Sequence, residues 1–142
     1  MYRNSGLIPE YYLVDNFAGW KKAFVEASGR CDLIYMPTNG AIKDWNKEEA
    51  ISFVAAGISK PIFTCDEFMM PYVVFGFTKI PAEQGRWVAK TIKRIAGGEK
   101  IANISQTRNE ERKIMINYNM ADKIGVYPDT NFLPGATKYN GE

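Results

Sequence analysis

The sequence predicts an α/β fold, a three-layer lobe built on a mainly parallel sheet, and three observations support this prediction. Short apolar segments rich in strand-forming residues alternate with longer segments that have helical spacing. Successive strands are separated by connections long enough to hold a helix, which favours parallel pairing. The apolar runs at 33–36, 62–63 and 73–75 do not alternate cleanly with polar residues, which is typical of strands covered on both faces.

The first strand is expected at 10–14, because Tyr-Tyr-Leu-Val is rich in strand formers. Asp15 or Asn16 then offers an N-cap for a helix that ends near residue 29. The apolar face of this helix is formed by Phe17, Trp20, Phe24 and Ala27. A second strand is expected at 32–36, and it stops at Pro37.

Asn46 followed by Glu49 resembles a capping box and predicts a second helix, which must end before Pro61. Beyond that proline the sequence predicts a strand at 61–65, a short helix at 68–72 and a strand at 73–78.

Pro81 suits the first position of a further helix, and the glycine pair at 97–98 suits its end. One face of this helix is apolar and consists of Trp87, Val88, Thr91, Ile92 and Ile95. Two short strands are expected at 102–106 and 113–117, then a short helix at 120–124 that ends at Gly125. The remainder, after Pro128, is predicted to be loop.

Composition excludes several classes of function. The net charge is +2 and the basic residues are scattered, so the sequence lacks the basic patch of a nucleic-acid-binding protein. It has no run of 18 apolar residues that would cross a membrane, and its first residues lack the apolar core of a signal peptide.

The chain contains no histidine, which removes histidine-based acid–base catalysis and the commonest metal ligand. Its two cysteines, Cys31 and Cys65, are too few for a disulfide framework or a cysteine-only zinc site. We therefore expect no enzyme, no catalytic residue, no metal and no cofactor.

Three polar loops are expected at one edge of the sheet, where the strands end and where open α/β sheets bind ligands. Their hydroxyl, amide, carboxylate and backbone N–H groups suit a small polar or zwitterionic ligand. The same residue types are also ordinary helix caps and turn formers. The candidate ligand-binding residues are Asn16, Thr38, Asn39, Cys65, Asp66 and Glu67. One nearby aromatic residue, Trp45, Phe68 or Tyr72, is a candidate for stacking on the ligand.

An ordered set of segments resembles a known family. These segments are DLIY at 32–35 with its Thr-Asn-Gly loop, KPIFT at 60–64, FGFTK at 75–79 with EQGRWVAK at 83–90, IAGGEK at 95–100, and IMIN at 114–117 with ADKIG at 121–125. The chain resembles the C-terminal half of ABC-transporter substrate-binding proteins with the type I periplasmic binding fold, in the branch similar to tryptophan/tyrosine transport proteins.

The resemblance implies one Rossmann-like lobe of a two-lobe protein that closes over a small molecule, such as an amino acid, for an ABC transporter or a sensor. It implies an ABC permease as partner and a periplasmic or extracytoplasmic location. It carries over Thr38 and Asn39 and the loop 65–67 as cleft residues, with Asn16 as the weaker member. The lobe is expected to span 10–128, between an extension at 1–9 and a tail at 129–142.

The sequence departs from the family because the N-terminal lobe expected before residue 10 is missing. The helix at 82–96, which packs on that lobe in the family, would then expose its apolar face. An exposed face of this kind marks an association surface, so a homodimer through 82–96 is expected, with exchanged elements as one form of it.

Two alternatives remain open. A receiver-like signalling domain of flavodoxin-like fold is suggested by Asp15, Asp66 and Lys79, although strand 32–36 lacks an acceptor aspartate at its end. An enzyme with Cys65 as nucleophile is the other, although no histidine is present to activate the thiol.

Overall fold

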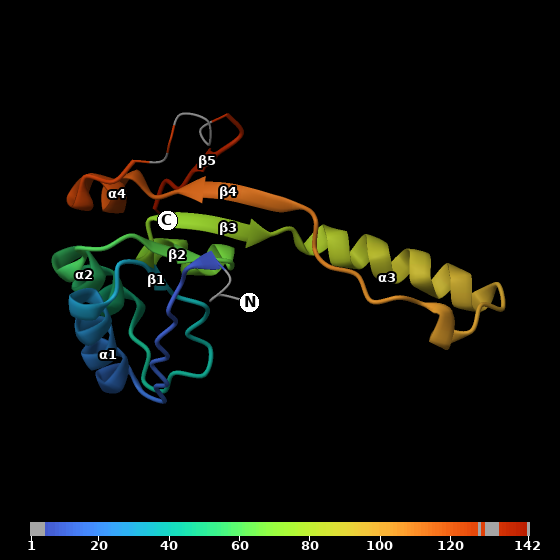
Figure 1. Cartoon of the computed structure of the whole chain (residues 1–142), viewed down its shortest axis with the longest axis horizontal. Helices are drawn as coiled ribbons and strands as arrows, with labels where there is room; N and C mark the ends of the chain where they lie inside the picture. The colour runs from blue at the N-terminus through green and yellow to red at the C-terminus, as the bar shows by residue number, and fades with distance from the viewer. Residues whose placement is uncertain (1–4, 128, 130–133, 142) are drawn as a thin grey trace.

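A computed structural model describes residues 5–127, 129 and 134–141, and it contains one five-stranded sheet in the order β1-β2-β3-β4-β5 (Figure 1). The strands β1 (Ile34–Tyr35), β2 (Ile62–Thr64) and β3 (Phe75–Lys79) pair in parallel. Strand β4 (Arg112–Ile116) is antiparallel to β3, and β5 (Thr137–Lys138) is parallel to β4. The predicted α/β fold with a mainly parallel sheet is confirmed.

Helices precede, connect and follow the strands, and asparagine side chains cap the N-termini of three of them. Helix α1 (Phe17–Arg30) begins where Asn16 Oδ1 accepts the Gly19 N–H at 2.8 Å. Helix α2 (Lys47–Gly57) begins in the same way at Asn46. A 3₁₀ helix, η2 (Glu67–Tyr72), links β2 to β3, and α4 (Tyr118–Ile124), capped by Asn117, follows β4. The predicted helices in these regions are therefore present.

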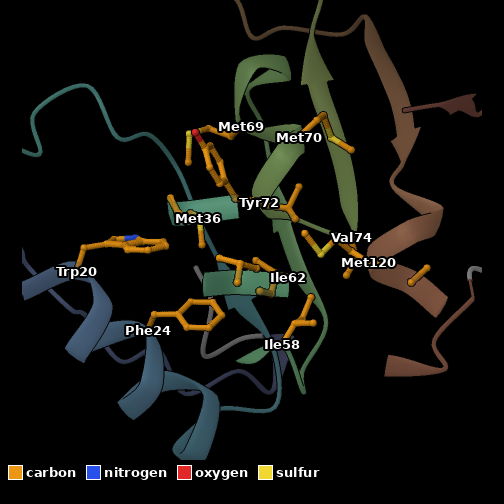
Figure 2. Packing of buried hydrophobic residues seen from close by; sticks show 14 of the residues in the cluster. Trp20, Phe24, Met36, Ile58, Ile62, Met69, Met70, Tyr72, Val74 and Met120 are labelled. Atoms are coloured by element: carbon orange, nitrogen blue, oxygen red, sulfur yellow. The ribbon is translucent and has the colours of Figure 1, made fainter. Parts of the chain in front are cut away.

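The hydrophobic core lies between the helices and one face of the sheet. Trp20 and Phe24 of α1 point toward Met36 and Ile62 from the strand region (Figure 2). The buried faces of η2 and α4 complete the core with Met69, Met70, Tyr72, Met120 and Ala121. All four residues that the helical spacing places on the apolar face of α1 are buried in the core. The packing of this face therefore holds the helix in position against the sheet.

Two predicted strands are wrong, and one strand was not predicted. Residues 10–14 have no regular structure and pair with no strand, and Leu13 is 94 % exposed. Residues 102–106 begin in a single 3₁₀ turn, η3 (Ile101–Asn103), and continue without regular structure. Strand β5 lies where a loop was predicted. Pro128, the expected end of the lobe, lies outside the described residues.

Burial alternates along β3, so its two faces differ. Gly76 and Thr78 point into the core, whereas Phe77 and Lys79 are exposed. The apolar run at 73–75 predicted cover on both faces, but beyond Phe75 this strand is open on one side. The strand register places further partly exposed apolar residues on the same open side.

Helix α3 (Pro81–Ala96) starts one residue after β3 and projects beyond the sheet (Figure 1). The chain returns along it through η3 to the start of β4. None of the residues of α3 is buried. We call the segment 80–111 the arm. Its apolar face is unprotected in the single chain.

Candidate functional site

The candidate ligand loops leave the sheet at one edge because their strands are parallel neighbours. Tyr35 of β1 lies opposite Phe63 of β2, and Met36 N–H donates to the Phe63 carbonyl at 2.9 Å. The loops that begin at Pro37 and Cys65 therefore leave adjacent strands side by side. The same edge holds the last residue of β3 and, because β4 is antiparallel, the first residues of β4. We call it the carboxyl edge.

The loop after β1 is a tight turn with polar groups open to solvent. Thr38 is exposed, and its Oγ1 accepts the Gly40 N–H at 3.3 Å. The Asn39 carbonyl accepts the Ile42 N–H at 3.0 Å, while its side-chain amide forms no hydrogen bond with the described residues. The Thr38 hydroxyl proton and the Asn39 amide thus remain available to a ligand.

The loop after β2 carries two carboxylates, and each forms an ion pair with a lysine from a neighbouring strand. Asp66 lies 2.9 Å from Lys79 Nζ at the end of β3. Glu67 lies 2.9 Å from Lys113 Nζ at the start of β4. The structure therefore adds Lys79 and Lys113 to the candidate residues. The sequence pointed to Lys79 only for the receiver-like alternative and not to Lys113, because both pairings depend on the strand register.

The ion pair with Asp66 shifts the pKa of Lys79. The hydrogen bond to the Asp66 carboxylate, followed by its charge, raises the pKa of Lys79. Lys79 therefore stays protonated throughout the neutral range. The carboxyl edge presents alternating positive and negative groups, a pattern that matches a zwitterion better than an ion of one sign.

Asn16 reaches this region by a different route from the one that the sequence predicted. No strand precedes it; instead its segment pairs with the chain after Asn39, where Lys43 N–H donates to the Asp15 carbonyl at 2.9 Å. The Asn16 side chain caps α1 and donates to the Asp15 carboxylate. Because both of its polar atoms are engaged, Asn16 positions the loop rather than offering free groups.

Of the three aromatic candidates, only Phe68 has an open ring. Tyr72 is 3 % exposed, and its hydroxyl accepts a hydrogen bond from Trp45 Nε1 at 3.2 Å. Trp45 packs edge-on against Trp20, so its ring is partly buried against the core cluster. Phe68 is 58 % exposed and directly follows the acidic pair.

Neither cysteine is disulfide-bonded, and both are partly exposed. Among the described residues, no group of three or more histidine, cysteine or acidic side chains is placed to hold a metal ion. No helix in the described part of the chain is long and apolar enough to cross a membrane.

The antiparallel β4 and the projecting arm depart from the receiver-like alternative, whose strands are all parallel.

Two surface hollows lie away from the candidate loops. One, of about 600 Å³, is lined by α1 and α2 side chains, including Val25 and Phe53. The other, of about 470 Å³, lies at the root of the arm and includes Ile80 and Arg112. Neither hollow is lined by Thr38, Asn39 or 65–67, although the second adjoins the first residue of β4 at the carboxyl edge.

The sequence matches no family model and no curated protein. Solved structures do match. An ABC domain in complex with L-Trp from Streptococcus pneumonia superimposes with a TM-score of 0.62 at 18% identity, covering 96% of this chain and 47% of its own. A substrate-binding protein with adhesive properties from Clostridium difficile, CD0873, in a ligand-free open structure, gives a TM-score of 0.62 at 11% identity, covering 88% and 41%.

A conserved domain protein from Vibrio cholerae gives a TM-score of 0.60 at 16% identity and covers 85% of this chain and 40% of its own. The chain thus has the fold of part of a periplasmic binding protein, as its resemblance to that family predicted. It spans less than half the length of each of these structures.

Proposed function

We propose that this chain is a solute-binding lobe and not an enzyme, and that it holds a small zwitterion such as an amino acid at the carboxyl edge. The observation that carries the proposal is the fold match over 85–96% of the chain to solved structures, two of which are described as a substrate-binding protein and as an ABC domain bound to L-Trp. The polar loops after β1 and β2 lie where ligands bind in open α/β sheets.

The chemistry of each loop suits one end of an amino acid. The Thr38 hydroxyl and the Asn39 amide can donate to a carboxylate. Asp66 and Glu67 can accept from an ammonium group, which would then compete with the bound lysines. Phe68 offers an exposed ring for an aromatic ligand side chain. Cys65 and Asn16 would help to position the backbone of the loops.

A second lobe belongs to this proposal. An open edge buries only part of a ligand, so the single lobe should bind weakly, and a second wall that closes over the site would supply the rest of the affinity. We place this lobe, expected at 10–128, in a two-lobe protein that works outside the cytoplasm with an ABC permease, or as the sensory part of a signalling protein.

The proposal is tested by titrating the ¹⁵N-labelled full chain with each of the standard L-amino acids and following amide chemical shifts. We expect saturable shifts at residues 38–40 and 65–68, with a dissociation constant of about 1 mM for this single wall. Asn39→Ala and Asp66→Ala should each weaken binding about tenfold, the loss of one hydrogen bond to a charged group.

Thr107→Ala is the matched control, because Thr107 is an exposed residue of the arm and belongs to neither candidate loop. It should bind as the parent does. If no amino acid produces saturable shifts at the two loops, or if both loop variants bind as tightly as Thr107→Ala, the proposed site is wrong.

A further inference from the structure

The hollow at the root of the arm is formed by three parts of the chain. Ile80 joins β3 to α3, residues 110–114 lead into β4, and a turn at 134–135 precedes β5. Lys79 and Arg112 are register partners across β3 and β4, so the start of β4 lies beside the start of α3 (Figure 1). The volume of about 470 Å³ is in the range of small-molecule sites, about 300–1,000 Å³. We call this site the root hollow.

Two charged side chains that line the root hollow have no partner among the described residues. The Arg112 guanidinium forms no ion pair or hydrogen bond with any of them. The Glu110 carboxylate forms none either, because the bond from Glu110 to Glu83 uses its backbone N–H. The other carboxylate of the lining, that of Glu111, is already paired with Arg86. One positive and one negative group therefore stay open to a ligand in the same hollow.

The rest of the lining is mostly apolar. Ile80 and Ile114 are partly buried, and Pro134 lies at the rim as an exposed residue. Ile114 is the register partner of Phe77, so its side chain lies on the open side of the sheet. A ligand with an apolar part would remove these surfaces from water.

We propose that the root hollow is a second binding site of this lobe and that it takes an amino acid with an apolar side chain. Arg112 donates two parallel N–H groups to the carboxylate of the ligand. Glu110 accepts from its ammonium group, and its side chain covers Ile80 and Ile114. Glu110 would repel a simple anion and Arg112 a simple cation, so a zwitterion matches the lining best.

A ligand in this hollow contacts the arm and the core together. Ile80 is the first residue of the arm, whereas Ile114 belongs to β4 in the sheet. Binding should therefore restrain the start of α3 relative to the sheet. The site differs from the loops after β1 and β2 in every residue, so this inference does not rest on the proposed function.

Titration of the ¹⁵N-labelled full chain with L-leucine gives the first test. We expect saturable amide shifts at residues 80, 112–114 and 135, with a dissociation constant of about 1 mM. Isocaproate has the same apolar body without the ammonium group, and isoamylamine has it without the carboxylate. Each should bind at least about tenfold more weakly, because one charged hydrogen-bonding group is missing. If either analogue binds as tightly as L-leucine, the assignment to a zwitterion is wrong.

Three variants with the same kind of substitution test the two charged groups. Arg112→Gln and Glu110→Gln should each weaken L-leucine binding about tenfold. Both positions are exposed, so the core is left intact. Arg108→Gln is the matched control, because Arg108 is an exposed arginine of the arm that does not line the hollow. An Arg112→Gln chain that binds L-leucine as tightly as the control overturns the proposal.

The positions of the shifts separate this inference from the proposed function. Shifts at the root hollow with none at 38–40 and 65–68 uphold the inference and count against the loop site. Shifts confined to those two loops overturn the inference and leave the loop site standing. Absence of shifts at the root hollow with every ligand also overturns it.

Discussion

At the scale of single residues, the tightest constraint lies at Gly76 in the middle of β3. A Cβ atom there would meet Met70 Sδ at 2.4 Å and Thr78 Cγ2 at 3.1 Å. Met70 and Thr78 are both fully buried, so neither has room to move away. The glycine lets η2 pack directly against the sheet, and it thereby sets the position of the loop that begins at Asp66.

We therefore expect Gly76→Ala to destabilise the chain by about 1–3 kcal/mol, the usual cost of overpacking a core. Gly85→Ala is the control. Nothing lies within 4 Å of a Cβ at Gly85, which sits inside α3, so alanine there should stabilise the helix by about 0.5–1 kcal/mol. Urea unfolding of the two variants measures both changes, and equal effects of the same sign would contradict the packing argument.

The positions of the ion-paired carboxylates Asp66 and Glu67 could be predicted from the sequence, but their lysine partners could not. That Asp66 and Glu67 follow a strand, and so lie at the carboxyl edge, was predictable from local pattern. That each carboxylate is matched by a lysine was not, because Glu67 and Lys113 are 46 residues apart and meet only through the antiparallel register of β3 and β4. The charge pattern of the candidate site is a product of tertiary structure.

At the scale of elements, helices were predictable and isolated strands were not. Helices α1 and α2 carry their own start signals, and the Asn16 and Asn46 side chains accept from Gly19 and Glu49 as such caps do. The segment at 10–14 has equally strong strand-forming residues but no neighbouring strand to pair with. The strand propensity of a residue measures how well its side chain packs on the surface of an existing sheet. It therefore does not predict whether a segment finds a neighbouring strand to pair with.

Polar contacts hold the arm at its root, where the Glu83 carboxylate accepts two backbone N–H groups and Arg86 forms an ion pair with Glu111. We expect Glu83→Ala to loosen the returning segment 101–109, because Glu110 and Glu111 lose their acceptors for backbone N–H groups. The ¹⁵N order parameters of that segment should fall, while the melting temperature of the core changes little. Glu83→Gln keeps an acceptor oxygen and should give an intermediate result. Unchanged order parameters in Glu83→Ala would show that the Glu83 carboxylate does not orient the arm.

At the scale of the whole molecule, the core and the arm are separable. The core unites α1, α2, η2, α4 and one face of the sheet, whereas α3 contributes no buried residue. Lys79 and Arg112 lie opposite each other at the ends of β3 and β4, so a two-residue turn can join them. The fold class was predictable because it depends on the core, and the direction of the arm was not, because it depends on the few contacts at its root.

Replacing residues 80–111 with Asn-Gly should therefore give a folded protein. Its urea m-value should stay close to that of the parent chain, because α3 has no buried residue and the m-value follows the surface exposed on unfolding. Circular dichroism should show the loss of one helix with cooperative unfolding retained. A non-cooperative transition would mean that the arm is required for the core to form.

The direct connection between β3 and α3 has a mechanical consequence. Lys79, which binds Asp66, is the last residue of β3, and the helix starts at Pro81. A helix of this length extends about 24 Å, so a tilt of about 10° at its root displaces its far end by about 4 Å while Lys79 barely moves. The arm therefore begins beside the candidate ligand loops, and a small rotation at this point moves its far end much more than its near end. A small change at the Asp66–Lys79 pair would therefore become a displacement of several ångströms at the far end of the arm.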